Sequence, residues 1–401
     1  MNTGQSVGAV PEPAWGQRAE LPPYTARRLG EERAGLARAL RERLLRAGLS
    51  WPEWIDARPG RLLVLLGDLG AEALLGRNAE ALLSEHGSLL LDGLGGLALA
   101  TATKRLVLAV PSGPLVAPAR ALCRGSSVEV METPAAYPSR PLTWTGGALG
   151  AALSPSGRTW VLPAAQLAAF GAAAQGRAAP RLCTIAGAVR QPTVVDLTPL
   201  VALPAAERTP AALVRRAGGA QVAAWVAVRG GAPAGELWPA EAELPPDCEQ
   251  LLILPAAHEL VARLRLGEPQ RLLRARNACL SCRLCTDLCP EAGDGLVPHQ
   301  ILRRLALGSE PQALWAAAAR CTGCGACSAL CPAELLPGAV LQGLQRAAQA
   351  AGHQPGAPTL RELDAALDAE EEAGPRDRPS LRPLARGLLL TRLGLAEYGA
   401  A

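Results

Sequence analysis

Two short runs of cysteine constrain this chain more than any other feature of its sequence. Eight of the 11 cysteines fall into these runs, which contain Cys279, Cys282, Cys285 and Cys289, and then Cys321, Cys324, Cys327 and Cys331. Each run has the spacing C-x2-C-x2-C-x3-C-P. The first three thiols of a run lie on one tight loop, whereas the wider gap and the proline direct the fourth away from it. The two runs are therefore expected to fold together.

This spacing is that of bacterial ferredoxins, where it binds [4Fe–4S] clusters and the fourth cysteine ligates the other cluster. The sequence predicts one cluster on Cys279, Cys282, Cys285 and Cys331. It predicts a second on Cys321, Cys324, Cys327 and Cys289. Zinc also takes four thiolates, but zinc sites usually show two separated C-x2-C pairs. The uninterrupted runs therefore favour iron–sulfur clusters over zinc.

The remaining cysteines, Cys123, Cys183 and Cys248, stand alone in the sequence and are expected to be small buried apolar residues. Between the two runs, Pro298 and His299 mark the start of a helix that joins the two half-sites. His299 either tunes a cluster through a hydrogen bond or is an ordinary solvent-facing residue at the helix start. The sequence favours the second interpretation.

Composition and charge exclude several classes of protein. Apolar residues make up 49% of the chain and charged residues 19%, which argues against wholesale disorder. A net charge of +4 indicates no nucleic-acid or membrane-surface patch. The sequence shows no secretory leader and no uninterrupted apolar window long enough to span a membrane. We therefore expect a cytoplasmic protein with reduced thiols.

The sequence before the cysteine runs indicates two modules. Apolar strands near residues 61–66 and 105–110 flank helical sequence over 71–100, which favours a parallel sheet. Short apolar runs between residues 181 and 231 predict a small β-rich module. The sequence thus indicates a multidomain protein of mixed α/β and α+β class. Its expected parts are a disordered arm (1–25), an α/β domain (26–177), a β-rich module (178–250), a helical two-cluster domain (256–350) and a linker with an Arg/Leu-rich end (351–401).

This order of parts resembles a known family. The β-rich module contains Cys183-Thr-Ile-Ala-Gly187-Ala-Val-Arg-Gln-Pro192, and Val297-Pro298-His299-Gln300 follows the first cysteine run. With the closing segment from Arg382 to Tyr398, these motifs are similar to the cobalamin reductases of propanediol-utilisation microcompartments, and to the related C subunits of Rnf electron-transport complexes. The resemblance implies a flavin-type first domain, a soluble-ligand-binding β-grasp (SLBB-like) module and a two-cluster ferredoxin-like domain.

In that family the first domain holds FMN, and here its site is degenerate. The family's Gly-rich GGAGFP loop is deleted after Gly48, and its E-C-E-P element keeps only Glu72, which the resemblance would place in an FMN site. The family's Y-P-x-G element becomes Tyr137-Pro138-Ser139-Arg140. Two other Gly-rich stretches, 93–96 and 145–150, are conceivable replacements for the phosphate loop. The two clusters are therefore expected, whereas FMN requires a rewritten site.

Three functions follow, and the first is favoured. The chain is an electron-transfer protein that passes electrons through two clusters to a redox partner, either a flavoprotein or a cobalamin-dependent system. Alternatively, it is an FMN-dependent NADH:cob(II)alamin-type reductase, an activity that the resemblance supplies. A third alternative is an interaction subunit at a microcompartment shell. Whether the chain is a complete enzyme stays open at this point.

Overall fold

The structure is a computed structural model of the whole chain. It describes residues 35, 38–40, 42, 64–70, 74–101, 103, 105–137, 159–202, 204–231, 235–245, 248–289, 291–292, 296–353 and 384–398. The predicted arm over residues 1–25 lies outside this part. The described residues that follow this arm, 35, 38–40 and 42, are helical, and Leu40 packs against the core of the first domain.

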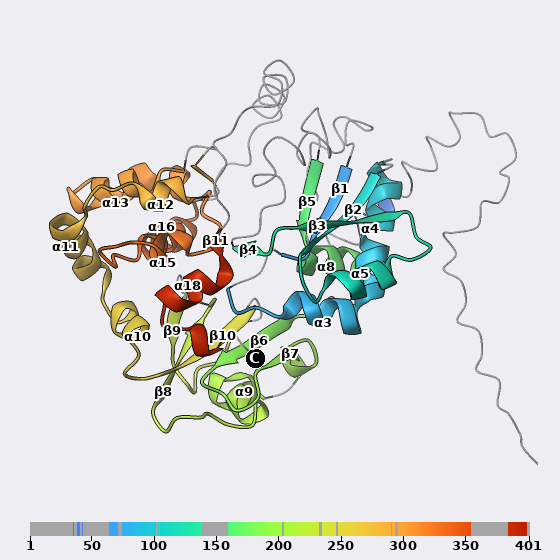
Figure 1. Cartoon of the computed structure of the whole chain (residues 1–401), viewed down its shortest axis with the longest axis horizontal. Helices are drawn as coiled ribbons and strands as arrows, with labels where there is room; N and C mark the ends of the chain where they lie inside the picture. Colours follow the sequence, from blue (N-terminus) through green and yellow to red (C-terminus); the bar gives the residue numbers. More distant parts are fainter. Residues whose placement is uncertain are drawn as a thin grey trace, which may run out of the picture.

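A parallel four-stranded sheet of order β3-β2-β1-β5 forms the first domain (Figure 1). Strand β1 (Val64–Asp68) pairs in parallel with β2 (Arg105–Pro111) on one side and β5 (Thr159–Pro163) on the other. Strand β3 (Val128–Thr133) extends the sheet beyond β2. Both faces of β1 and β2 are buried, which explains their continuous apolar runs. The predicted parallel sheet is confirmed.

Helices cover one face of this sheet and share a core with it. They are α3 (Asn78–Glu85), α4 (Gly87–Thr101), α5 (Val116–Leu122) and α8 (Ala164–Ala174). A Cβ atom at Gly93 would collide with the backbone of Leu167, and one at Gly171 would collide with the backbone of Leu89. Glycine at these positions lets α4 and α8 pack closely. The Gly-rich stretch 93–96 thus lies inside a packed helix rather than in a phosphate loop.

The second sheet is mixed and five-stranded, with the order β7-β6-β10-β8-β9. Its strands are β6 (Leu182–Gly187), β7 (Thr193–Asp196), β8 (Trp225–Arg229), β9 (Glu236–Trp238) and β10 (Gln250–Pro255). The central pair, β6 and β10, is parallel, and the other pairs are antiparallel. Helix α9 (Pro210–Arg216) packs on one face, next to the 3-10 turns η1 (Pro199–Ala202) and η2 (Ala205–Arg208).

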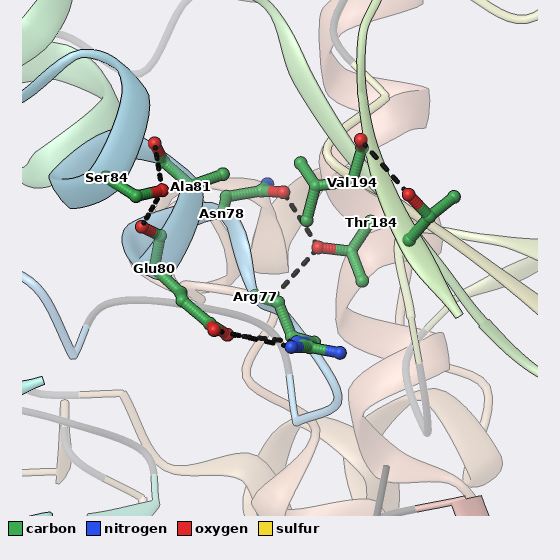
Figure 2. Close-up of polar contacts among 8 residues, drawn as sticks. Arg77, Asn78, Glu80, Ala81, Ser84, Thr184 and Val194 are labelled. Carbon is green, nitrogen blue, oxygen red and sulfur yellow. Dashed lines mark hydrogen bonds and ion pairs between the residues drawn. The ribbon is translucent and has the colours of Figure 1, made fainter. Parts of the chain in front are cut away.

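Residues at the start of α3 form hydrogen bonds to the second sheet and so connect the first domain to it, as Figure 2 shows. The Arg77 N–H donates to Thr184 Oγ1 at 2.9 Å, and the Thr184 hydroxyl donates to Asn78 Oδ1 at 2.7 Å. The Asn78 amide also donates to the carbonyl oxygens of Leu182 at 3.2 Å and Glu249 at 3.0 Å. These partners lie on β6 and just before β10, so one asparagine satisfies the backbone of both central strands.

The cysteine runs lie in a domain of short helices. These are α10 (Glu259–Leu264), α11 (Glu268–Ala278), α12 (Leu284–Asp287), α13 (Pro298–Ala306), the 3-10 turn η4 (Pro311–Leu314), α14 (Trp315–Ala318), α15 (Ala326–Ala329) and α16 (Pro337–Ala350). The helix predicted to begin at Pro298 is confirmed. Helices α11, α13, α14 and α16 pack around a core of their own.

The C-terminal segment joins the three parts. Strand β11 (Leu384–Ala385) pairs antiparallel with β4 (Ala136–Tyr137) of the first domain. Helix α18 (Arg386–Arg392) then packs on α15, and the chain continues into the 3-10 turn η5 (Ala396–Tyr398). In Figure 1 the red α18 lies between the helical domain and the second sheet. One buried cluster accordingly combines residues of all three parts with Leu389, Leu390, Leu393 and Leu395. Across the described ranges, no helix has the length and apolar character needed to cross a membrane.

Candidate metal centre

The two cysteine runs fold into two loops of the same shape. In the first loop Ser281 and Arg283 adopt positive φ angles of 52° and 64°. In the second loop the equivalent residues are Gly323 and Gly325, with φ angles of 73° and 72°. Left-handed backbone at these two positions turns each loop tightly around its middle cysteine. The sequence repeat is therefore also a structural repeat.

Each loop leads into a short helix that carries the third cysteine. Cys285 lies in α12 and Cys327 lies in α15, and these two helices pack on each other. The fourth cysteine of each run follows its helix. A longer helix then begins with proline at its first turn, α13 after the first run and α16 after the second. Because α13 packs on α16, the two half-sites are held face to face.

The last cysteine of the second run lies with the first three of the first run. A small cavity is lined by Cys279, Cys282, Cys285 and Cys331 together. Burial raises the pKa of the Cys285 thiol to about 12, and the neighbouring Cys331, Cys282 and Cys279 add to this effect. The backbone N–H of Leu335 donates to Cys331 Sγ at 3.5 Å. These four thiols, here called the first group, come from both runs.

A second group of thiols combines three cysteines of the second run with the last cysteine of the first. Burial, together with the neighbouring Cys324 and Cys321, raises the pKa of the Cys289 thiol to about 12. Cys327 is buried, and this burial, together with Cys324, Cys321 and Cys289, raises its pKa well above the ordinary value. Burial also raises the pKa of Cys321 to about 11. The fourth cysteine of the first run thus lies with the first three of the second.

Backbone groups around the thiols suit a cluster. A backbone hydrogen bond from Gly323 lowers the pKa of Cys321, and one from Glu291 lowers that of Cys289, each opposing the effect of burial. Such N–H groups stabilise negative sulfur and set cluster potentials. Within the described part of the chain, no three His, Cys, Asp or Glu side chains converge as ligands of a single metal ion. A [4Fe–4S] cluster needs no such convergence, because each thiolate bonds to a different iron.

His299 lies beside the first group rather than at an isolated helix end. It is half-buried and lines the same cavity as the four thiols. Its Nδ1 lies 2.8 Å from the hydroxyl of Thr286, which follows Cys285 and also accepts the His299 N–H at 3.3 Å. Burial and the nearby Arg283 lower the pKa of His299. The sequence favoured an ordinary solvent-facing histidine. The structure instead places His299 next to the thiol group, where it is only partly exposed.

The second group is tied to other parts of the molecule. The Tyr137 hydroxyl donates to the carbonyl oxygen of Cys324 at 2.5 Å, and Tyr137 is only 5% exposed. The Gln345 amide, from α16, donates to the carbonyl oxygens of Cys321 at 2.8 Å and Ala319 at 3.2 Å. The second loop is therefore held by side chains from two different domains. Sequence analysis missed both contacts, although it did single out Tyr137 as part of a family motif.

The structure describes some of the other positions that the sequence singled out. Cys123, Cys183 and Cys248 are all buried, as predicted. Cys183 and Cys248 were not expected to meet, yet their sulfur atoms form a hydrogen bond at 3.9 Å in the core of the second sheet. Three other positions of the prediction lie outside the described residues. They are Glu72, the residues around Gly48 after which the family's Gly-rich loop is missing, and the stretch 145–150. The FMN site implied by the family resemblance therefore stays a prediction.

Comparison with known proteins supports the cysteine interpretation. Residues 257–336 match the model of the 4Fe-4S dicluster domain family. A stretch of 55 residues is 47% identical to the cobalamin reductase PduS of Salmonella typhimurium and 46% identical to that of Citrobacter freundii. This stretch is 13% of the present chain and spans only 12% of the length of each of these relatives. Residues 257–336 are thus similar to 4Fe-4S dicluster domains, which supports iron–sulfur clusters in this part of the chain.

Solved structures of NAD+-reducing [NiFe]-hydrogenase are also similar to the chain. The H2-reduced state gives a TM-score of 0.44 with 18% identity, over 89% of this chain and 69% of the other. The air-oxidized state gives 0.43 with 19% identity, over 86% and 68%.

The loop geometry predicts opposite effects for two Gly→Ala substitutions. Gly325 has a φ of 72°, where alanine costs about 1–2 kcal/mol. Gly343 lies inside α16 with open space around a Cβ atom, and alanine there should stabilise by about 0.5–1 kcal/mol. We expect Gly325→Ala to lower the thermal midpoint and slow cluster assembly, and Gly343→Ala to raise the midpoint. Equal effects of the two substitutions would contradict the assigned loop conformation.

Proposed function

We propose that this chain carries electrons through two [4Fe–4S] clusters to a redox partner protein. The first cluster is held by Cys279, Cys282, Cys285 and Cys331, and the second by Cys321, Cys324, Cys327 and Cys289. The observation that carries the proposal is the exchange of fourth cysteines between the two loops. Cys331 lies with the first three cysteines of the first run, and Cys289 lies with the first three of the second.

The protein's own residues set the conditions for electron transfer. When bound, each cluster accepts or releases one electron. The thiols hold it, the loop N–H groups stabilise its charge, and the burial of Cys289 and Cys327 excludes water from the second site. The packing of α12 on α15 brings the two sites together, so that an electron can pass from one to the other.

The other domains form a scaffold for the two clusters. We assign residues 26–177 to a diverged flavin-type domain, 178–250 to an SLBB-like β-grasp module and 351–401 to a linker and tail. The strand order β7-β6-β10-β8-β9, with a helix after the first hairpin and parallel central strands, is that of a β-grasp fold. This order favours the module assignment beyond the short motif found in the sequence.

An FMN-dependent reductase is the alternative function. The local similarity to cobalamin reductase PduS favours it, and so do the parallel sheet of the first domain and the retained Tyr137. The same similarity is the reason to consider a setting in or at a microcompartment. Copurification of flavin distinguishes the reductase from the electron carrier.

Electron paramagnetic resonance (EPR) tests the proposed function. The reconstituted protein, reduced anaerobically, is expected to show two interacting S = 1/2 signals, and stepwise oxidation should return about two electrons per chain, one for each cluster. A single isolated signal with about one electron per chain would contradict the two-cluster proposal.

Tyr137→Phe tests the link between the first domain and the second cluster loop. The substitution removes the hydrogen bond to Cys324 and leaves its partly buried carbonyl oxygen without this donor. We expect a loss of about 1 kcal/mol in the free energy of unfolding and a shift in the midpoint potential of one cluster only. Unchanged potentials and unchanged stability would show that this contact has no role.

A further inference from the structure

The two cluster loops differ sharply in exposure. Every residue from Leu280 to Leu284 in the first loop is exposed, including Cys282. In the corresponding stretch of the second loop, residues 322–326, only Thr322 is exposed, whereas Gly325 and Ala326 are buried. Two loops of the same shape and spacing therefore differ in exposure, and the first is the more open to solvent.

The second loop is buried because the other domains cover it. Tyr137 contacts Cys324 from the first domain, and Ala329 belongs to the buried cluster shared with the second sheet and α18. No comparable cover reaches the first loop among the described residues. Electron transfer falls steeply with distance, so an external protein approaches the pair of clusters most closely at the first loop.

The exposed first loop presents two leucine side chains to solvent. Leu280 is 70% exposed and Leu284 is 41% exposed, on either side of Cys282. Two further exposed leucines lie on the neighbouring elements, Leu273 in α11 at 58% and Leu307 after α13 at 68%. In the whole described part, Leu99 at 37% is the other large apolar side chain of this kind. Exposed apolar groups gathered around one site mark an interaction surface.

The surroundings of the loop are positively charged. Arg274, Arg276, Arg283, Arg303 and Arg304 are all exposed, and within the described residues none of them forms an ion pair. Arg303 donates to the Ser281 hydroxyl at 2.6 Å, which holds α13 against the loop. The sequence has no Asp or Glu between Glu268 and Asp287, although both of these flank the region. A partner surface that complements this one is acidic.

We propose that residues 280–284 with Arg303, here called the docking loop, form the surface on which an acidic electron-carrier protein binds. The proposal rests on the proposed function and names the cluster through which electrons are exchanged, that of Cys279, Cys282, Cys285 and Cys331. In each exchange one electron leaves a reduced cluster and the carrier's oxidised centre gains it. No bond breaks and no proton is required.

Leu280→Glu tests the docking loop, with Leu99→Glu as its control. Both changes place the same negative charge at an exposed leucine, and Leu99 lies on α4 of the first domain. The probe is an oxidised plant-type [2Fe–2S] ferredoxin, a strongly acidic carrier. Its binding to the reconstituted full chain is measured by calorimetry at low and high salt, and its footprint by hydrogen exchange.

We expect ferredoxin to bind more weakly at high salt and to protect the backbone of residues 280–284. Leu280→Glu should weaken binding about tenfold, as loss of a central apolar contact does, whereas Leu99→Glu should bind as the unaltered chain does. Salt-independent binding, protection elsewhere, or equal affinities of the two variants would overturn the proposal. Iron content and reduction by methyl viologen, measured on the same samples, report separately on the proposed function, and their failure would refute that function instead.

Discussion

Replacing Cys289 by serine should remove the cluster of the second run and leave that of the first. Cys289 lies with Cys321 and Cys324, although it belongs to the first run in sequence. Serine is a poor ligand for iron, so we expect iron to fall from about eight to about four per chain. Iron analysis after anaerobic reconstitution measures the loss, and EPR shows whether the coupling between two clusters has disappeared.

Two double variants show which cluster has been lost. If Cys289 and Cys324 serve one cluster, Cys289→Ser with Cys324→Ser should still retain about four irons. Cys289→Ser with Cys282→Ser should then retain almost none, because it damages both clusters. Each run holding its own cluster would give the reverse pattern, and that result would refute the exchange of fourth cysteines.

Truncation of Leu389 should destabilise the whole molecule. Its side chain is fully buried in α18, in the cluster that joins the first domain, the second sheet and the helical domain. Leu→Ala at such a position costs about 2–5 kcal/mol, depending on how far the cavity collapses. We expect a marked drop in the denaturant midpoint, and also faster loss of iron, because α18 packs on α15 beside Cys327.

Leu307→Ala is the matched control for this substitution. Leu307 is 68% exposed, so the same change in side chain removes little buried surface and should alter stability by less than about 0.5 kcal/mol. If Leu389→Ala unfolds at the same midpoint as Leu307→Ala, the C-terminal segment does not hold the three parts together.

Features carried by local spacing could be predicted from the sequence. The spacing of the cysteine runs predicted two loops of the same kind, because the turn and the proline are encoded within a dozen residues. The parallel sheet followed from apolar strands too continuous for a half-exposed sheet. The burial of Cys123, Cys183 and Cys248 followed from the usual character of a free cysteine. In each case the determining residues lie close together in the chain.

Contacts between distant segments could not be predicted in this way. Tyr137 and Cys324 lie far apart in sequence, and no periodicity connects them. The pairing of β4 with β11 and the proximity of Cys183 to Cys248 likewise depend on how whole domains pack. His299 shows the same limit, because the helix start at Pro298 was evident but its position beside a thiol group required the fold. The surroundings of the metal centre thus depend on tertiary structure more than its ligands do.

The most direct test is to count iron and flavin on one sample. The full chain is purified without oxygen, reconstituted with iron and sulfide, and assayed for iron, acid-labile sulfide and flavin together. The proposed function predicts about eight irons and about eight sulfides per chain, without flavin. About eight irons with one FMN would instead favour the reductase. Fewer than about four irons, or bound zinc in place of iron, would contradict the two-cluster electron carrier.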